Sequence, residues 1–129
     1  MTFNKDIQIF KNIINDLDCD LIESKINQIA KLIIKVSKSN QTTAIFGNGG
    51  SASDSNHLAG ELTCTFSDKN RTAINAISLV SNPSVISAWS NDVDFEFVFS
   101  RQIEALKNTL GLAIGLSTSG KSKNVLSGL

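Results

Sequence analysis

Several features that would assign this chain to a specialised class are missing from it. Its formal net charge is zero and it has no basic block or tail, so general binding to nucleic acid lacks electrostatic support. No apolar run approaches the roughly 20 residues that a membrane-spanning helix needs. The N-terminal residues show neither a continuous apolar stretch nor a small-residue cleavage site, which argues against a signal peptide. We therefore expect a cytoplasmic protein without a nucleic-acid or membrane partner.

Cysteine and proline are also scarce. The two cysteines, Cys19 and Cys64, lie far apart and outside any metal-binding spacing, so we interpret them as reduced thiols. The only proline, Pro83, stands where a helix is expected to begin. The rest of the composition is ordinary for a globular chain, with 41% hydrophobic and 19% charged residues, and 129 residues suit one core.

The hydrophobic pattern changes its period along the chain. Apolar residues at helical spacing predict two helices within residues 3–38, with a break near Cys19. Short β-rich runs predict strands over residues 42–46, 72–79 and 110–117, and helical stretches lie between them at about 52–66, 83–90 and 94–107. This alternation predicts right-handed βαβ units, and hence an α/β fold with a parallel sheet.

The predicted domain organisation has two parts. We expect an N-terminal helical segment over residues 1–40 and a partial α/β domain over residues 41–129. Three strands would leave both outer edges of the sheet exposed, and the sequence stops inside the helix expected after the third strand. We therefore expect either a piece of a longer protein or a domain that something else completes.

The stretch "GNGGSAS" follows the first predicted strand and precedes a helix, which is where parallel sheets bind ligands. Gly47, Gly49 and Gly50 would let the backbone approach a ligand, and the helix N-terminus would offer free N–H groups. A tight turn with a serine cap is the structural alternative. A P-loop is excluded because no lysine is present. The dinucleotide pattern G-x-G-x-x-A fits, but the second strand lacks the acidic residue that would bind a ribose.

His57 and Glu61 are four residues apart on a predicted helix and share one face. An imidazole and a carboxylate at this spacing can bind one metal ion or act in acid–base chemistry. The alternative is a surface His–Glu pair worth a few tenths of a kcal/mol, and spacing alone favours that alternative.

A second polar loop, "STSGKS", follows the third predicted strand. It brings together four hydroxyl groups and a glycine that permits a tight turn of N–H groups, and this combination is typical of a phosphate site. An ordinary serine-rich loop with a helix cap explains the stretch equally well. Because both loops follow parallel strands, they are expected to face one crevice, with a phosphate at one loop and a polyhydroxyl group at the other.

Three segments in this order, "GNGGSASDSNHLAGEL", "AWSNDVDFEFVFSRQIEAL" and "GLSTSGKSKNVL", resemble the sugar-isomerase (SIS) domain of bacterial phosphoheptose isomerases. The resemblance spans nearly the whole chain and implies a three-layer α/β SIS fold. It also implies the family's activity, the conversion of sedoheptulose 7-phosphate to D-glycero-D-manno-heptose 7-phosphate for lipopolysaccharide or capsule. The family is zinc-dependent and homotetrameric, with N-terminal helices packed between subunits.

Roles for individual residues follow from this resemblance. His57 and Glu61 match the family's zinc-binding histidine and glutamate, and Glu61 matches its catalytic acid/base as well. The residues that match the family's substrate contacts are Asn48, Gly49, Gly50, Glu61, Asn91 and Asp92 for the sugar, and Ser117, Thr118, Ser119 and Ser122 for the phosphate.

The sequence departs from the family's pattern in two places. Thr65 stands where the family commonly has an arginine, and Arg71 is the candidate replacement. The family's further zinc and acid–base partners, a glutamine and a histidine on a later helix, have no counterpart here, so we expect no isomerase activity from this chain alone. The rival interpretation is a non-catalytic SIS module that binds a sugar phosphate or the replication initiator protein.

Overall fold

The structure, a computed structural model, describes residues 2–129. Two compact units make up the chain, one ending at Leu32 and the other spanning Ile33–Leu129. Among the described residues, no helix is both long enough and apolar enough to cross a membrane.

The two predicted N-terminal helices are confirmed. Helix α1 spans Phe3–Asn15 and α2 spans Cys19–Lys38, with the break immediately before Cys19. Asp18 caps α2, because its carboxylate accepts a 2.9 Å hydrogen bond from the main-chain N–H of Leu21. Helix α1 buries none of its residues, and its apolar side chains are exposed.

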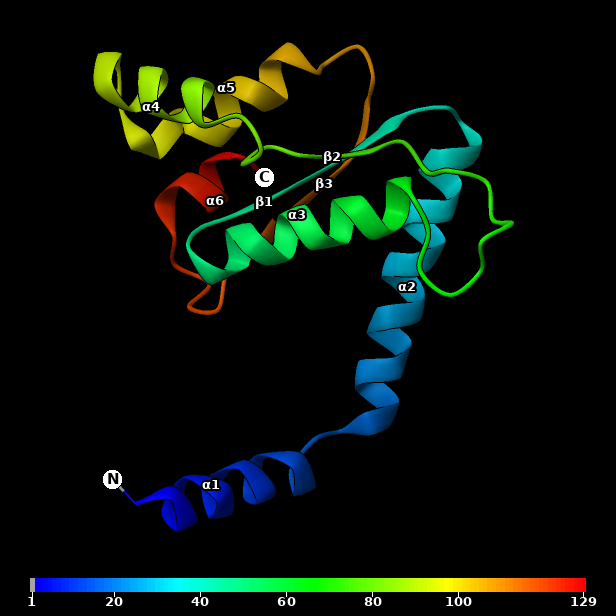
Figure 1. The fold of residues 1–129 in the computed structure, drawn as a ribbon, viewed down its shortest axis with the longest axis vertical. Coiled ribbons are helices and arrows are strands. Elements are labelled where there is room, and N and C mark those ends of the chain that lie inside the picture. Colours follow the sequence, from blue (N-terminus) through cyan, green and yellow to red (C-terminus); the bar gives the residue numbers. More distant parts are fainter. Residues whose placement is uncertain (1) are drawn as a thin grey trace. The chain divides into compact units, whose positions relative to one another are not determined.

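The second unit is built on a three-stranded parallel sheet in the order β2-β1-β3 (Figure 1). Strand β1 (Thr42–Gly47) is central and buried along its whole length. Strand β3 (Leu110–Leu116) pairs along most of β1, and β2 (Ala76–Ser78) pairs with its middle. The predicted parallel sheet and its three strands are therefore confirmed.

The second strand is shorter than the predicted range of 72–79. Residues before Ala76 use their polar groups elsewhere: the main-chain N–H of Ile74 donates to the carbonyl of Leu62 at 3.1 Å, and the side chain of Asn75 donates to the hydroxyl of Thr42 at 2.9 Å. Only the carbonyl of Asn75, which accepts the N–H of Thr43 at 2.9 Å, reaches the central strand from this part of the run.

The remaining helices are α3 (Gly50–Thr63), α4 (Pro83–Asp92), α5 (Val98–Ala105) and α6 (Lys123–Ser127). Pro83 opens α4 as predicted, and Asn82 caps the helix. The helical stretch predicted over about 94–107 is present, but its first turn differs in type from the rest. A short 3₁₀ turn, η1 (Phe95–Phe97), comes first, since the Asp94 carboxylate accepts the N–H of Glu96 at 2.7 Å.

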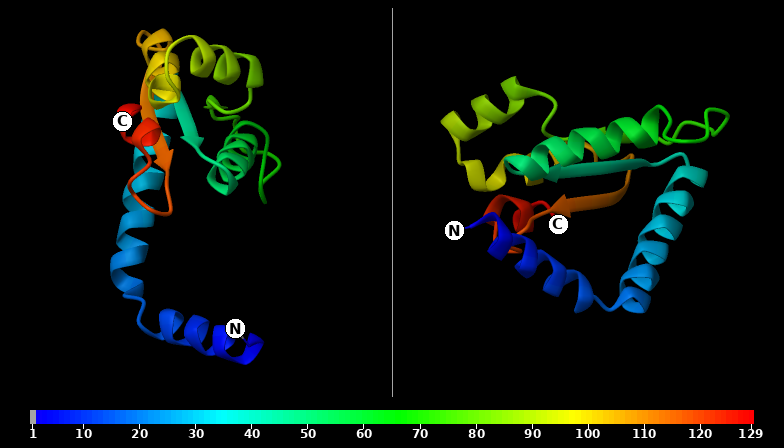
Figure 2. Two further views of the ribbon diagram at one scale, coloured as in Figure 1. Left: turned by 90° about the vertical axis from the view of Figure 1, so that its left-hand side faces the viewer. Right: turned by 60° about the horizontal axis from the view of Figure 1, so that its bottom comes forward.

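These helices cover both faces of the sheet, so the predicted three-layer α/β fold is confirmed (Figure 2). Because side chains alternate along a strand, Ala44 and Phe46 point to the face that carries α5 and α6, where the core lies. The rings of Phe46 and Phe99 meet there with centroids 4.9 Å apart. Helix α3 packs on the opposite face, with Ser55 and Ala59 buried.

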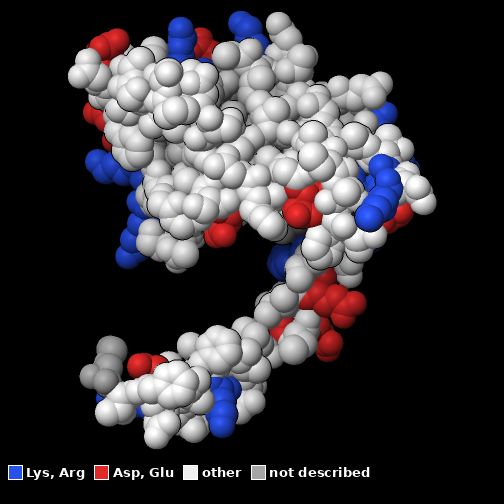
Figure 3. All heavy atoms as spheres, viewed as in Figure 1, with Lys and Arg blue, Asp and Glu red and all other residues white. Residues whose placement is uncertain are grey.

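Charged side chains of both signs are scattered over the face drawn in Figure 3. On this face, lysine and arginine alternate with aspartate and glutamate and form no broad patch of one sign. This distribution accompanies a formal net charge of zero. Both Cys19 and Cys64 are exposed free thiols.

Candidate functional site

The two loops singled out in the sequence leave the sheet side by side. Gly47 at the end of β1 is paired in register with Leu116 at the end of β3, so residues 48–50 and 117–122 emerge at one edge (Figure 1). Parallel α/β sheets bind their ligands beyond this edge. The structure therefore brings the glycine loop and the serine loop together, as the order of the elements predicts.

At two positions of the first loop, the backbone conformation or its close packing permits only glycine. Gly49 has φ of +55°, a conformation that glycine adopts easily and other residues rarely do. At Gly47 a Cβ atom would lie 2.8 Å from both the Leu116 carbonyl oxygen and the Ser51 Cβ, so a side chain does not fit. Gly50 has open space around it, and nothing in the protein itself demands glycine there.

Asn48 is held by a residue from the other loop. Its side-chain amide donates to the Asn124 Oδ1 at 2.8 Å, and the Asn124 amide donates back to the Asn48 Oδ1 at 2.8 Å. Asn124 lies at the start of α6 and is only 3% exposed. A cavity of about 450 Å³ lies beside the pair, with Ser122 on one side and Asp94–Glu96 on the other.

The serine loop is ordered by its own hydroxyl groups. The Ser117 Oγ lies 3.1 Å from the Ser122 Oγ and accepts the N–H of Gly120 at 3.1 Å, while the Ser119 Oγ accepts the N–H of Lys121 at 3.2 Å. Gly120 has φ of +64°, which closes the turn. Thr118 is exposed at the tip. The loop thus gathers hydroxyl groups and N–H donors over a few residues, which is what a phosphate requires.

His57 and Glu61 share one face of α3, as predicted. The His57 Nε2 lies 3.7 Å from the Glu61 Oε1; the imidazole is 77% exposed and the glutamate side chain 31%. The other oxygen, Oε2, is buried without a hydrogen-bond partner. Along the helix axis, His57 lies about 10 Å and Glu61 about 16 Å from Gly50, given a rise of about 1.5 Å per residue.

Arg71 closes the far end of the same helix. Its guanidinium donates to the main-chain carbonyls of Glu61 at 2.8 Å and Leu62 at 2.9 Å, and also to that of Thr72 at 2.8 Å. The carbonyls of Glu61 and Leu62 belong to the last turn of α3, which leaves its final carbonyls without partners inside the helix and carries no basic residue. Arg71 therefore lies next to the backbone of Glu61 rather than at the position of Thr65.

The structure does not bring Asn91 and Asp92 to the cavities beside Asn48. They lie exposed at the end of α4, where the Asn91 amide donates to the Asp92 carboxylate at 2.8 Å. The residues that lie beside Asn48 from this part of the chain are Asp94, Phe95 and Glu96. Neither Asn124 nor this trio is predicted from the sequence, because no local pattern connects segments that are so far apart along the chain.

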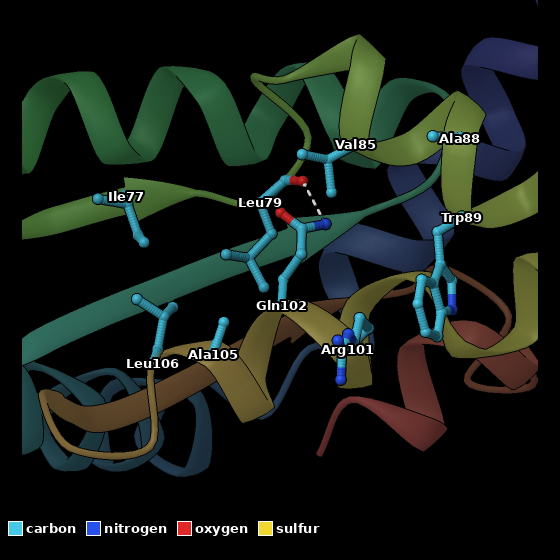
Figure 4. A pocket seen from close by; sticks show the side chains of 9 residues that line it. All are labelled: Ile77, Leu79, Val85, Ala88, Trp89, Arg101, Gln102, Ala105 and Leu106. Carbon is cyan, nitrogen blue, oxygen red and sulfur yellow. Dashed lines mark hydrogen bonds between the residues drawn. The ribbon is translucent and has the colours of Figure 1, made fainter.

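A larger and mostly apolar cavity, of about 510 Å³, lies away from the loops, between β2, α4 and α5 (Figure 4). Trp89 and Arg101 stand at one end and Ile77 and Leu106 at the other, with the guanidinium 4.9 Å from the Trp89 ring centroid. The Gln102 amide donates to the Leu79 carbonyl at 3.0 Å. None of the predicted ligand residues lines this cavity.

The model of the SIS domain family matches residues 10–129, nearly the whole chain. The chain belongs to the SIS-domain family. Its glycine and serine loops therefore lie within an SIS domain, as the resemblance implied.

Relatives of this SIS domain include curated and structurally solved proteins. Phosphoheptose isomerase 1 of Campylobacter jejuni is 44% identical over 110 residues, covering 85% of this chain and 59% of that protein. The phosphoheptose isomerase of Aquifex aeolicus is 42% identical, with 85% and 57% covered. The solved phosphoheptose isomerase GmhA from Neisseria gonorrhoeae superposes with a TM-score of 0.75 at 31% identity, covering 98% of this chain and 62% of that one. The chain thus spans about three-fifths of the length of these relatives.

Proposed function

We propose that this chain forms the sugar-phosphate-binding part of a phosphoheptose isomerase, which converts sedoheptulose 7-phosphate to D-glycero-D-manno-heptose 7-phosphate. The observation that carries the proposal is the juxtaposition of the glycine loop and the serine loop at the ends of β1 and β3. The relatives named phosphoheptose isomerase support the choice of substrate.

In this proposal the serine loop binds the phosphate. Ser117, Ser119 and Ser122 offer hydroxyl groups, Thr118 adds a fourth at the tip, and two of these hydroxyls already accept main-chain N–H groups of the turn. A phosphate oxygen is a stronger acceptor than a hydroxyl, so it would take over those N–H groups. The binding energy from the phosphate then holds the sugar carbons against the glycine loop, remote from the phosphate itself.

Glu61 is the candidate acid/base. Aldose–ketose isomerisation moves a proton between two adjacent carbons through an enediol, and one carboxylate can take the proton from the first carbon and return it to the second. The Glu61 side chain is 31% exposed on α3, and its buried Oε2 has no hydrogen-bond partner, so this carboxylate is not committed to another group of the protein. Asn48, Gly49 and Gly50 would contact the sugar. The resemblance implies the same role for Asn91 and Asp92, which lie exposed at the end of α4 and away from the cavities beside Asn48.

A zinc ion is part of the same proposal. The His57 imidazole and the Glu61 carboxylate are donor types that zinc accepts, and the unpartnered Oε2 fits this use. They supply two ligands, and the described residues form no group of three or more His, Cys, Asp or Glu side chains that would hold a metal. When bound, zinc would polarise the sugar carbonyl. The residues present thus fit one half of a zinc site.

Assembly and location complete the proposal. The exposed apolar side chains of α1 support a homotetramer in which the N-terminal helices pack between subunits. A cytoplasmic location is in line with two free thiols in the described chain.

The proposal is tested by titrating the chain with sedoheptulose 7-phosphate in a calorimeter and by assaying turnover in D2O. We expect saturable binding that weakens about tenfold or more in the Ser119→Ala/Ser122→Ala variant, since each lost hydrogen bond to a charged group is worth about 1.5–3 kcal/mol. The exposed Ser39→Ala serves as the matched control.

Turnover distinguishes an enzyme from a binding module. In a longer version that carries the family's later glutamine and histidine, an isomerase incorporates solvent deuterium into the product. There Glu61→Gln should lower that rate about 10²–10⁴-fold, while Glu104→Gln, at an exposed position, leaves it unchanged. The Campylobacter jejuni relative is the positive control. Absence of any sugar-phosphate binding would refute the proposed function, and binding without turnover in every longer version would favour a non-catalytic module.

A further inference from the structure

The closed pair of hydrogen bonds between Asn48 and Asn124 joins two loops that are 76 residues apart in the sequence. Asn48 is the first residue after β1, and Asn124 is the second residue of α6. Each amide donates to the other's oxygen at 2.8 Å, so one N–H and the carbonyl oxygen of each residue are used inside the pair.

The pair has one favourable geometry. Asn124 is 3% exposed, so solvent cannot replace the partner of its amide if the two side chains separate. Leaving a buried donor or acceptor unpaired costs about 1–3 kcal/mol, which strongly disfavours any other orientation of Asn48. A carboxamide has two N–H donors and two acceptor lone pairs, and the pair leaves Asn48 with one donor and one lone pair that face away from Asn124.

The same pair connects the two halves of the site. Asn124 follows Ser122 by two residues, and Ser122 contacts Ser117 at 3.1 Å in the serine loop. Asn48 adjoins Gly49 and Gly50 in the other loop. Asn48, Ser122 and Asn124 all line the cavity of about 450 Å³. A change in the position of α6 is therefore transmitted directly to the amide of Asn48.

We propose that Asn124 is a positioning residue that fixes the Asn48 amide and couples the glycine loop to the serine loop. A ligand with both a phosphate and neighbouring hydroxyl groups then gains from both loops at once, whereas inorganic phosphate depends on the serine loop alone. The inference rests on the proposed function only for the identity of this ligand; the coupling of the two loops is a property of the pair.

The test uses the near-isosteric Asn124→Asp variant. At pH 8 its carboxylate still accepts from Asn48 but has no proton to donate to the Asn48 Oδ1, so the pair is broken on one side. Burial at this position, which is 3% exposed, should raise the pKa of the introduced carboxyl well above its ordinary value, so that toward pH 5 the carboxyl is protonated, regains an O–H donor and restores both hydrogen bonds. Asn124→Ala, which has no donor at any pH, is the matched control, and every affinity is divided by that of the unaltered protein at the same pH.

We expect Asn124→Asp to weaken sedoheptulose 7-phosphate binding at pH 8 about tenfold, in line with one lost hydrogen bond and one unpaired buried acceptor, and to recover toward pH 5. Binding of inorganic phosphate should change by less than about threefold, because only one loop is involved. Asn124→Ala should not recover. Equal losses for both ligands without recovery would overturn the inference, since they would indicate only damage to the fold.

A second readout applies even if the chain binds no sugar phosphate, in which case the proposed function fails by itself. In NMR spectra, the Asn48 side-chain NH2 protons should be well separated and slow to exchange in the unaltered protein. In Asn124→Asp at pH 8, the chemical shifts of these two protons should move closer together and the protons should exchange rapidly with solvent. At pH 5 the separation and the slow exchange should return. Unchanged Asn48 resonances in Asn124→Asp at pH 8 would show that Asn124 does not fix this amide.

Discussion

The guanidinium of Arg71 donates a 2.8 Å hydrogen bond to the main-chain carbonyl of Glu61, the residue at the centre of the proposed chemistry. A second bond of 2.9 Å goes to the neighbouring carbonyl of Leu62. The end of a helix leaves its last carbonyls without partners inside the helix. A single side chain thus closes α3 and fixes the backbone from which the Glu61 carboxylate projects.

Arg71→Ala should therefore destabilise the protein by about 2 kcal/mol, because hydrogen bonds from a charged donor are worth about 1.5–3 kcal/mol each and part of that is recovered by water. Urea unfolding followed by circular dichroism measures the change. The other arginine of the sequence is the control: Arg101 pairs with Glu104 on the surface, so Arg101→Ala should cost about 1 kcal/mol or less. Equal losses in the two variants would show that Arg71 is an ordinary surface cation.

Adjacent glycines of the first loop should differ sharply in their response to alanine. Gly49→Ala forces a side chain onto a backbone with φ of +55° and should cost about 1–3 kcal/mol. Gly50 has open space and begins α3, so Gly50→Ala should leave stability unchanged or raise it by about 0.5 kcal/mol. Thermal unfolding of both variants checks this. If Gly50→Ala also loses sugar-phosphate affinity while it folds normally, the free space beside Gly50 belongs to the ligand.

The contact between Phe46 and Phe99, whose rings are tilted by 34° to each other, should contribute a large share of the stability of the core. Phe99 is 1% exposed and its ring lies 4.9 Å from that of Phe46, so Phe99→Ala should cost about 3–5 kcal/mol. That is a large share of the stability of a small domain. Phe66 is 79% exposed, and Phe66→Ala should change the free energy of unfolding by less than about 0.5 kcal/mol. Denaturant unfolding of the two variants decides the matter, and a small effect at Phe99 would contradict the packing described here.

Metal binding by this chain should be weak and should depend on His57. The described residues supply two donors where zinc takes four, so we expect saturable but loose binding that is lost in His57→Ala. Because Cys19 and Cys64 are exposed thiols that also bind zinc, the calorimetric titration requires the Cys19→Ser/Cys64→Ser background. Asp54→Asn, on an exposed position of the same helix, is the control. Tight stoichiometric zinc binding would show that further ligands are present.

The sequence predicted the features that depend on local pattern. The buried strand β1, the parallel order of the strands and the meeting of the two loops all follow from apolar runs that end in glycine or serine. The length of β2 could not be predicted from the sequence. Isoleucine is common in strands, but the main-chain N–H of Ile74 donates to the carbonyl of Leu62 at the end of α3 instead of pairing in the sheet. Asn124 was not predicted either, since its partner lies 76 residues away and no spacing connects them. Contacts between such distant segments can be identified only once the fold is known.

The last prediction concerns the apolar side of α1. Ile7, Phe10 and Ile14 lie on one face of this helix and are 38%, 61% and 50% exposed, while no residue of α1 is buried. Exposed apolar surface of this extent is rare unless a partner covers it. We therefore expect the protein to associate at micromolar concentration through α1, with light scattering after size exclusion giving the mass of the proposed tetramer.

The substitutions Phe10→Lys and Ile14→Lys, made together, should shift that mass toward the monomer, because each buries a charge where an apolar contact stood. Helix content should persist, since lysine is a good helix former. The matched control adds the same two charges on the opposite face through Gln8→Lys and Asn12→Lys, whose side chains contact each other at 3.0 Å on the surface. If the control dissociates equally, added charge rather than the apolar face controls assembly. A monomeric unaltered protein would contradict association through α1 altogether.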